Sequence, residues 1–253
     1  MTASERIRSA LEYTIIVIVT FFVMQTLVVI MHEFTHSTVA WFLGHMRSPL
    51  DIVWGNPLTL RGWDEGVSYI ELIKSGHLIA EAIIGVSPLV LHTAIVTLGL
   101  ILMLKGIPRN KWFFHFLFWF VIANFMELIA YIVMRAFAQN GDTGHFSHGL
   151  GLSPWILFIV GSLAVVLGLY VLFGEIITRM YTVFTRGNRV IEWIILIMTA
   201  FFLFLWGSGI RVVSAVYPDH QWMFGLLGFV AFGLVIITSN PARAWMLRRK
   251  EMK

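Results

Sequence analysis

The sequence VVIMHEFTHSTVAWFLG, residues 28–44, carries a histidine, a glutamate and a second histidine within a long apolar run. In a membrane helix such groups are costly, so they need mutual partners or a function. The apolar run begins near residue 12 and shows no small-residue cleavage site, which is typical of a retained span rather than a signal peptide. We therefore predict a membrane helix over about 12–43 with a polar site in its second half.

The composition indicates that most of the chain lies in lipid. Hydrophobic residues make up 58% of the chain and charged residues 13%, with a mean hydropathy of +0.82. Soluble domains carry about 25% charged residues. Since about 20 apolar residues cross a bilayer, the sequence predicts an all-α integral membrane protein with one polytopic domain over 1–253. We expect about six transmembrane helices, at about 12–43, 78–104, 112–137, 153–177, 190–216 and 221–239.

Two connections differ from the short ones. Segment 44–77 contains SPLDIV, NPLTLRG and the charged RGWDEG, which favour a short hairpin or a re-entrant segment. Segment 138–152, AQNGDTGHFSHGLGL, is rich in Gly and His and is predicted to be a loop. The chain has no cysteine, so any metal site must use His, Asp, Glu or water.

The placement of basic residues predicts the orientation. Most of the 18 Lys and Arg residues fall at the N-terminus, in the second and fourth connections and in the tail over 240–253. By the positive-inside rule both termini should be cytoplasmic. The same rule explains the net charge of +4 through membrane anchoring, so we expect a lipid bilayer and no nucleic acid as partner.

The motif His32-Glu33-Phe34-Thr35-His36 matches the H-E-x-x-H pattern of zinc metallohydrolases. Residues four apart share one face of a helix, so both imidazoles can reach one ion. Glu33 can then take a proton from a water that the ion activates. A divalent ion held by two His, a carboxylate and a water is most simply zinc, one per chain.

A catalytic zinc usually has a third protein ligand. The best candidate is Asp142, with His145 and His148 as alternatives. His32 lies about nineteen residues into its span, about 29 Å from the cytoplasmic end. This places the site toward the non-cytoplasmic side, where 138–152 also lies.

Other polar residues within the spans are candidates for supporting roles. Asn124 and Glu127 share a helix face. Asn124 is expected to bind a substrate strand or an oxyanion, and Glu127 to support a ligand histidine, with an inter-helix polar contact equally expected for both. Arg211 is expected to pair with an acidic residue or orient a substrate carboxylate. Glu81 is interpreted as a charge at a helix start, and the sequence assigns no partner to His92.

With these motifs identified, the chain resembles the site-2 protease family of intramembrane zinc metalloproteases. HEFTHSTVAWFLG resembles the family's metal helix, with Thr35 where glycine is usual. IIGVSPLVLHTAIV, residues 83–96, is similar to its Gly-Pro-led helix start, and DTGH, residues 142–145, resembles the element that supplies the third ligand. The resemblance covers a metalloprotease-like core over about 12–150, followed by additional helices over about 153–239.

The resemblance implies His32, His36 and Asp142 as zinc ligands, Glu33 as general base, and Asn140 or Asn124 as the asparagine near the aspartate. It also implies hydrolysis of a peptide bond in or near a transmembrane segment of a membrane-protein substrate. Two alternatives stay open: a membrane zinc hydrolase acting on a lipid or a small amide or ester, and a non-catalytic metal-binding membrane protein.

Overall fold

The structure is a computed structural model that describes residues 3–56, 62–185, 187–210, 222–239 and 241. Within these ranges the chain is almost entirely helical and contains no strand. The elements in chain order are α1 Ala3–Phe42, α2 Tyr69–Lys74, α3 Leu78–Leu104, α4 Lys111–Leu128, η1 Ile129–Met134, α5 Asp142–Gly149, α6 Pro154–Val171, η2 Leu172–Ile176, α7 Ile177–Phe184, α8 Arg189–Ala200, η3 Phe201–Ile210 and α10 Trp222–Thr238.

The prediction of an all-α fold is confirmed and the apolar helices are consistent with a membrane protein, but the number of spans differs. Five helical stretches in the described residues are long and apolar enough to cross a membrane: Ser4–Phe42, Leu78–Leu104, Lys111–Met134, Pro154–Phe184 and Arg189–Gly207. The sixth expected span corresponds to α10, which has 17 residues. A helix of this length extends about 26 Å, slightly less than the hydrocarbon core of about 30 Å.

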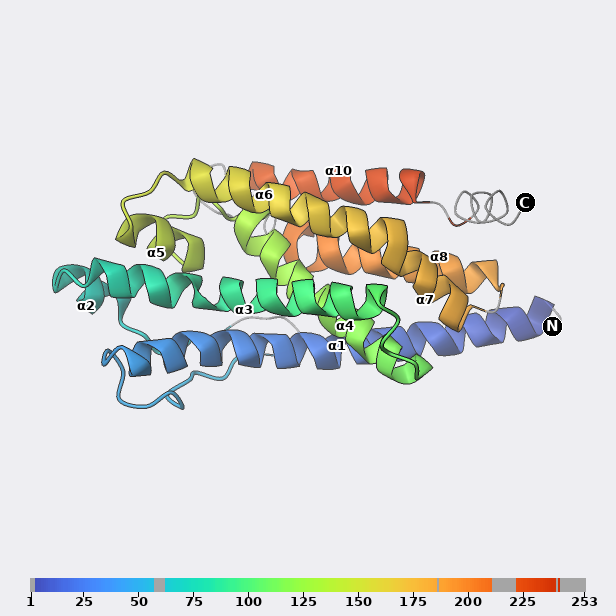
Figure 1. Ribbon diagram of the computed structural model, residues 1–253, viewed down its shortest axis with the longest axis horizontal. Helices are drawn as coiled ribbons and strands as arrows, with labels where there is room; N and C mark the ends of the chain where they lie inside the picture. The colour runs from blue at the N-terminus through green and yellow to red at the C-terminus, as the bar shows by residue number, and fades with distance from the viewer. Residues whose placement is uncertain (1–2, 57–61, 186, 211–221, 240, 242–253) are drawn as a thin grey trace.

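The helices lie side by side in an elongated bundle (Figure 1). The start of α1, the α3–α4 connection and the α7–α8 connection meet at one end, while α2 and α5 lie at the other. Two hydrogen bonds join elements at the first end: Arg179 Nη1 donates to Met103 O at 2.9 Å, and Asn188 Nδ2 donates to Arg6 O at 3.4 Å. The basic connections identified in the sequence therefore share one end of the bundle.

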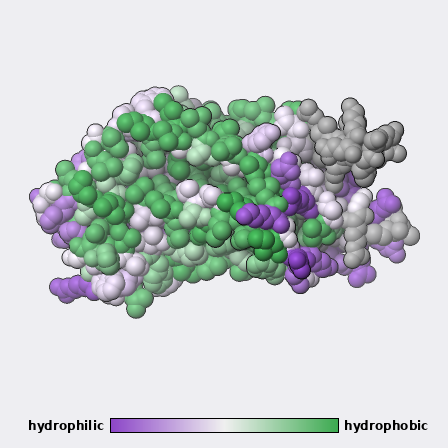
Figure 2. Space-filling model, viewed as in Figure 1, coloured by the Kyte–Doolittle hydropathy of each residue, from purple (hydrophilic) through white to green (hydrophobic). Residues whose placement is uncertain are grey.

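The surface agrees with a membrane location. Figure 2 shows hydrophobic residues over the middle of the bundle and a concentration of hydrophilic residues toward the end where α1 begins. Several apolar helices of this kind are compatible with a multi-pass membrane protein. The cytoplasmic location of the termini stays a prediction from the basic residues.

The core is centred on α4, whose large side chains are almost completely buried. Phe118, Trp119 and Phe125 are at most 1% exposed. Phe21 of α1 stacks on Phe202 of η3 with ring centroids 3.5 Å apart, and Trp119 packs edge-on against both rings. By contrast, most of the α6 surface is exposed and apolar, as expected for a helix that faces lipid.

Segment 44–77 forms a hairpin-like excursion beside the second half of α1. An antiparallel bridge joins Val53 and Asp64, where short strands or a re-entrant segment were expected. Ser37 Oγ, which is fully buried, donates to Pro49 O at 2.9 Å and ties this excursion to α1. Ring contact between Phe34 and Trp54, with centroids 6.2 Å apart, makes a second attachment.

One expectation about local structure was wrong. Segment 138–152, predicted to be a loop, contains the eight-residue helix α5. The span predicted at 78–104 coincides with α3, and Pro88 of the Gly-Pro stretch lies in its interior rather than at a helix start. Both features contribute to the site.

Candidate metal centre

Two histidines on one face of α1 form the first half of the site. His32 and His36 are 4% and 1% exposed, and their Nε2 atoms are 3.2 Å apart. The rings meet edge to face with centroids 4.9 Å apart. The i,i+4 spacing thus places both imidazoles side by side on one face of the helix, as the sequence predicts.

Asp142 supplies the second half from the first residue of α5. Its Oδ2 atom lies 3.1 Å from His32 Nε2 and 3.4 Å from His36 Nε2. The ligand atoms of these three buried residues lie within 4.8 Å of one another, and no other such group is found in the described residues. The structure thus brings together the three residues predicted as ligands.

The alternative ligands His145 and His148 are engaged elsewhere. His145 Nδ1 and His148 Nδ1 donate to opposite oxygens of Glu81, each at 2.8 Å. Glu81 is fully buried in the first turn of α3. Its carboxylate therefore fastens α5 to α3 rather than acting only as a charge at a helix start, and this fixes the position of Asp142.

Small residues allow α3 and α5 to approach closely. A Cβ built on Gly85 would lie 2.9 Å from Asp142 O and 3.0 Å from His145 Cβ. A Cβ on Gly149 would meet the backbone at Leu78 and Ala82. Glycine at both positions is needed for the packing that brings Asp142 to the histidines.

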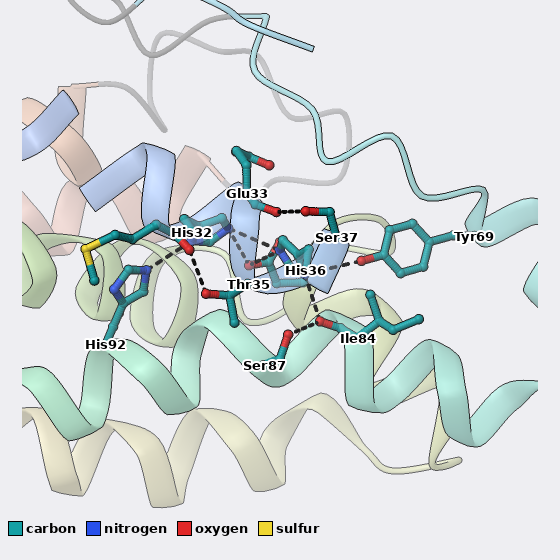
Figure 3. Close-up of polar contacts among 11 residues, drawn as sticks. His32, Glu33, Thr35, His36, Ser37, Tyr69, Ile84, Ser87 and His92 are labelled. Atoms are coloured by element: carbon teal, nitrogen blue, oxygen red, sulfur yellow. Dashed lines mark hydrogen bonds and ion pairs between the residues drawn. The ribbon is translucent and has the colours of Figure 1, made fainter. Parts of the chain in front are cut away.

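A proline in α3 orients His36. Pro88 has no backbone N–H, so the carbonyl of Ile84, four residues earlier, lacks its usual helical donor. His36 Nδ1 donates to this oxygen at 2.7 Å and Ser87 Oγ donates to it at 2.8 Å (Figure 3). With its Nδ1 hydrogen used in this way, neutral His36 presents the lone pair of Nε2 to Asp142.

His32 contacts two other rings. The centroid of the His92 ring of α3 lies 5.3 Å from that of His32, and the Tyr131 ring of η1 lies at 5.2 Å. The His32 Nδ1 atom is 3.1 Å from His92 Nε2. Figure 3 shows His92 extending from α3 toward His32 of α1.

The donor set fits a divalent cation. Asp142 Oδ2 is buried and makes no hydrogen bond in the described part of the chain. Burial opposes ionisation, but the adjacent His36 and His32, when protonated, hold the pKa of the Asp142 carboxyl well below its ordinary value. The two imidazole nitrogens and the carboxylate oxygen therefore favour positive charge between them, as protons on the rings or as a bound metal ion, and this N₂O set suits zinc.

Glu33 occupies a different environment from the ligands. It is only partly buried, whereas His32, His36 and Asp142 are buried. In Figure 3 its carboxylate projects from α1 on the side away from the α3 residues Ile84 and Ser87. Because Phe34 touches Trp54, this side of α1 borders the hairpin-like excursion. Glu33 is thus adjacent to the ligand histidines in sequence and only partly buried.

The remaining predicted residues have mixed outcomes. Asn124 is fully buried, and its amide bonds to His92 and to Phe120 O rather than facing the ligand atoms. Glu127 is 4% exposed and makes no hydrogen bond or ion pair within the described ranges, so its support of a ligand histidine stays a prediction. Asn140 is exposed before α5. Arg211 falls outside the described residues.

Sequence reasoning missed the roles of His92, Glu81 and Pro88. Each of them acts through a residue on another helix, so no local spacing reveals it. The available signal was chemical: a histidine and a glutamate in an apolar helix must find partners, and a proline inside a helix leaves a carbonyl available.

The fold is an all-α bundle whose apolar helices are compatible with a multi-pass membrane protein, and it holds a candidate metal centre between α1 and α5. No family model, curated protein or solved structure matches the chain. The function is therefore argued from the geometry of the site.

Proposed function

We propose that this protein is a zinc-dependent intramembrane metalloprotease of the site-2 protease kind. The observation that carries the proposal is the convergence of His32 Nε2, His36 Nε2 and Asp142 Oδ2 within 3.1–3.4 Å of one another, with Glu33 on the same helical turn. This is the H-E-x-x-H arrangement with a third ligand from a distant element. When bound, zinc would supply the Lewis acidity that lowers the pKa of a water and polarises a substrate carbonyl.

The chain's own residues would perform the proton transfers. Glu33, which is partly exposed beside the buried ligands, would accept a proton from the attacking water. It would then give that proton to the departing amine as the C–N bond of the substrate breaks. The products are a carboxylic acid and an amine, which become a carboxylate and an ammonium group by transfer of the remaining water proton, and Glu33 returns to its starting ionisation state.

A peptide substrate fits the surroundings of Glu33. A transmembrane helix must unwind locally before its amide can be attacked, because its backbone groups are hydrogen-bonded within the helix. The excursion over 44–77 borders the Glu33 side of α1 through Ser37–Pro49 and Phe34–Trp54. We infer that this excursion clamps the unwound segment by backbone pairing.

The test is cleavage of single-span reporter peptides by zinc-loaded protein in liposomes. Wild type should cleave at least one peptide of the set. Glu33→Gln should abolish cleavage while retaining zinc, because Glu33 is not a ligand. The matched control is Glu12→Gln, an exposed acid-to-amide change on the same helix, which should cleave normally.

Other outcomes identify the alternatives. Hydrolysis of a lipid ester or a small amide without peptide cleavage would overturn the protease proposal in favour of a lipid or small-molecule hydrolase. Cleavage that persists in Glu33→Gln would overturn the role of Glu33. Bound zinc without any hydrolysis by wild type would favour a non-catalytic metal-binding protein.

A further inference from the structure

A chain of hydrogen-bonding groups leads from the backbone of α4 to the ligand His32. Asn124 Nδ2 donates to Phe120 O at 2.8 Å. Asn124 Oδ1 lies 2.8 Å from His92 Nδ1, and His92 Nε2 lies 3.1 Å from His32 Nδ1. The chain thus links α4, α3 and α1 in that order.

The direction of each hydrogen bond follows from the first one. Because the Asn124 amide nitrogen donates to a backbone carbonyl, its oxygen is turned toward His92 and can only accept. His92 must then donate from Nδ1, and in a neutral imidazole this leaves a lone pair on Nε2. His32 therefore donates from Nδ1 to His92, which leaves the His32 Nε2 lone pair directed at Asp142.

Burial means that this series of hydrogen bonds allows only one tautomer of each histidine. Asn124 and His92 are both 0% exposed, and His32 is 4% exposed. A buried donor facing another donor, or a buried acceptor facing another acceptor, loses its hydrogen bond without compensation from water. The opposite tautomer of either histidine would create such a mismatch, so the chain selects one arrangement.

His92 is not a ligand itself. It contacts Nδ1 of His32, whereas the proposed cation position is defined by Nε2 of the same ring together with Asp142 Oδ2. The two ligand histidines are thus oriented in different ways. His36 donates to a backbone oxygen, Ile84 O, while His32 donates to a side chain whose own state is set by Asn124.

We propose that His92 and Asn124 are positioning residues that fix the tautomer and the ring orientation of His32 for metal binding. The inference rests on the metal site of the proposed function but not on proteolysis. Partners of this kind around a metal site typically change affinity by about 10–100-fold when they are removed.

The test measures cobalt(II) affinity by titration of its visible absorption in detergent-solubilised protein. His92→Leu should weaken cobalt binding by about 10–100-fold and alter the absorption spectrum. His92→Gln can still offer an amide oxygen to His32 Nδ1, so its affinity should recover most of the loss. Asn124→Leu removes the acceptor for His92 Nδ1 and should weaken cobalt binding to a similar extent.

The matched control is His115→Leu. His115 is also a fully buried histidine between helices, but it lies near Tyr13 Oη and Thr20 Oγ1 at 3.4 and 3.2 Å. This substitution should cost stability without changing cobalt affinity. An equal loss of affinity in His115→Leu and His92→Leu would overturn the inference, as would unchanged binding by His92→Leu.

A measurement on the unmodified chain covers the case in which a variant fails to fold. Nitrogen-15 NMR of histidine-labelled wild type without metal should show His32 and His92 protonated at Nδ1. Protonation of either neutral ring at Nε2 would overturn the inference. Failure of folded wild type to bind cobalt at all would instead overturn the metal site, and the positioning role with it.

Discussion

Gly85→Ala tests whether the contact between α3 and α5 sets the position of Asp142. A Cβ at this position would lie 2.9 Å from Asp142 O, 3.0 Å from His145 Cβ and 3.3 Å from Phe146 N. Relief of these contacts requires α5 to move away by about 0.5–1 Å, since two of the three atoms are backbone and cannot rotate aside. A metal site tolerates errors of only about 0.2 Å in its ligand distances.

The expected result is a loss of zinc affinity in a protein that still folds. Alanine favours helix α3 by about 1 kcal/mol over glycine, while overpacking costs about 1–3 kcal/mol. The net loss of stability is therefore small. We expect zinc affinity to fall by about 10–100-fold, equivalent to about 1.4–2.8 kcal/mol.

The assay is competition for zinc with a fluorescent chelator in detergent, with circular dichroism to check helicity. Gly233→Ala is the matched control, because it lies in helix α10 with no atom within 4 Å of the built Cβ. It should bind zinc like wild type. Equal zinc affinities for Gly85→Ala, Gly233→Ala and wild type would refute the reasoning that close packing at Gly85 positions Asp142.

Three further predictions concern the groups around the ligands. Glu81→Gln would turn an amide N–H toward the N–H of a buried histidine, so the free energy of unfolding should fall by about 1–3 kcal/mol. Thermal unfolding measures this loss, and an unchanged midpoint would contradict the role of Glu81 in holding α5 to α3. Pro88→Ala restores a backbone N–H that competes with His36 for Ile84 O. Competition with a chelator should then show zinc affinity about tenfold weaker at unchanged helicity. Wild-type affinity in this variant would argue against a role of Pro88 in orienting His36. Zinc retained on dialysis should fall steeply below about pH 6 because protonated imidazoles cannot ligate, and retention at about pH 4 would speak against histidine ligands.

The sequence predicts the parts of the site that depend on local periodicity. His32 and His36 meet because a helix brings i and i+4 together, whatever surrounds it. The apolar runs likewise predict helices, since a backbone in lipid must satisfy its own hydrogen bonds. The number of membrane spans was harder to predict, because α10 has 17 residues and lies at the lower limit of length for a transmembrane helix.

The choice of third ligand depended on tertiary contacts. Asp142, His145 and His148 stand close together in the sequence and all can ligate zinc. Only the position of the buried Glu81 on α3 separates them, because it engages both histidines and leaves Asp142 turned toward α1. Nothing in the spacing of segment 138–152 encodes that separation.

The glycines of segment 138–152 gave a misleading local signal for a related reason. The glycines of DTGHFSHG predict a loop, yet Gly149 is required where α5 packs on the start of α3. Pro88 lies inside the predicted span 78–104, but its role there is visible only in the fold, where it leaves the Ile84 carbonyl available to His36. In both cases the residue serves contact with another helix rather than the conformation of its own segment.

The most direct test is zinc content per chain in protein purified without added metal and after zinc is supplied. Wild type and Asp51→Ala, an exposed aspartate in the excursion over 44–77, should hold about one zinc each, and Asp142→Ala much less. Zinc unchanged in Asp142→Ala would assign the third ligand to another residue. Folded wild type that binds no zinc even when it is supplied would contradict the metal centre.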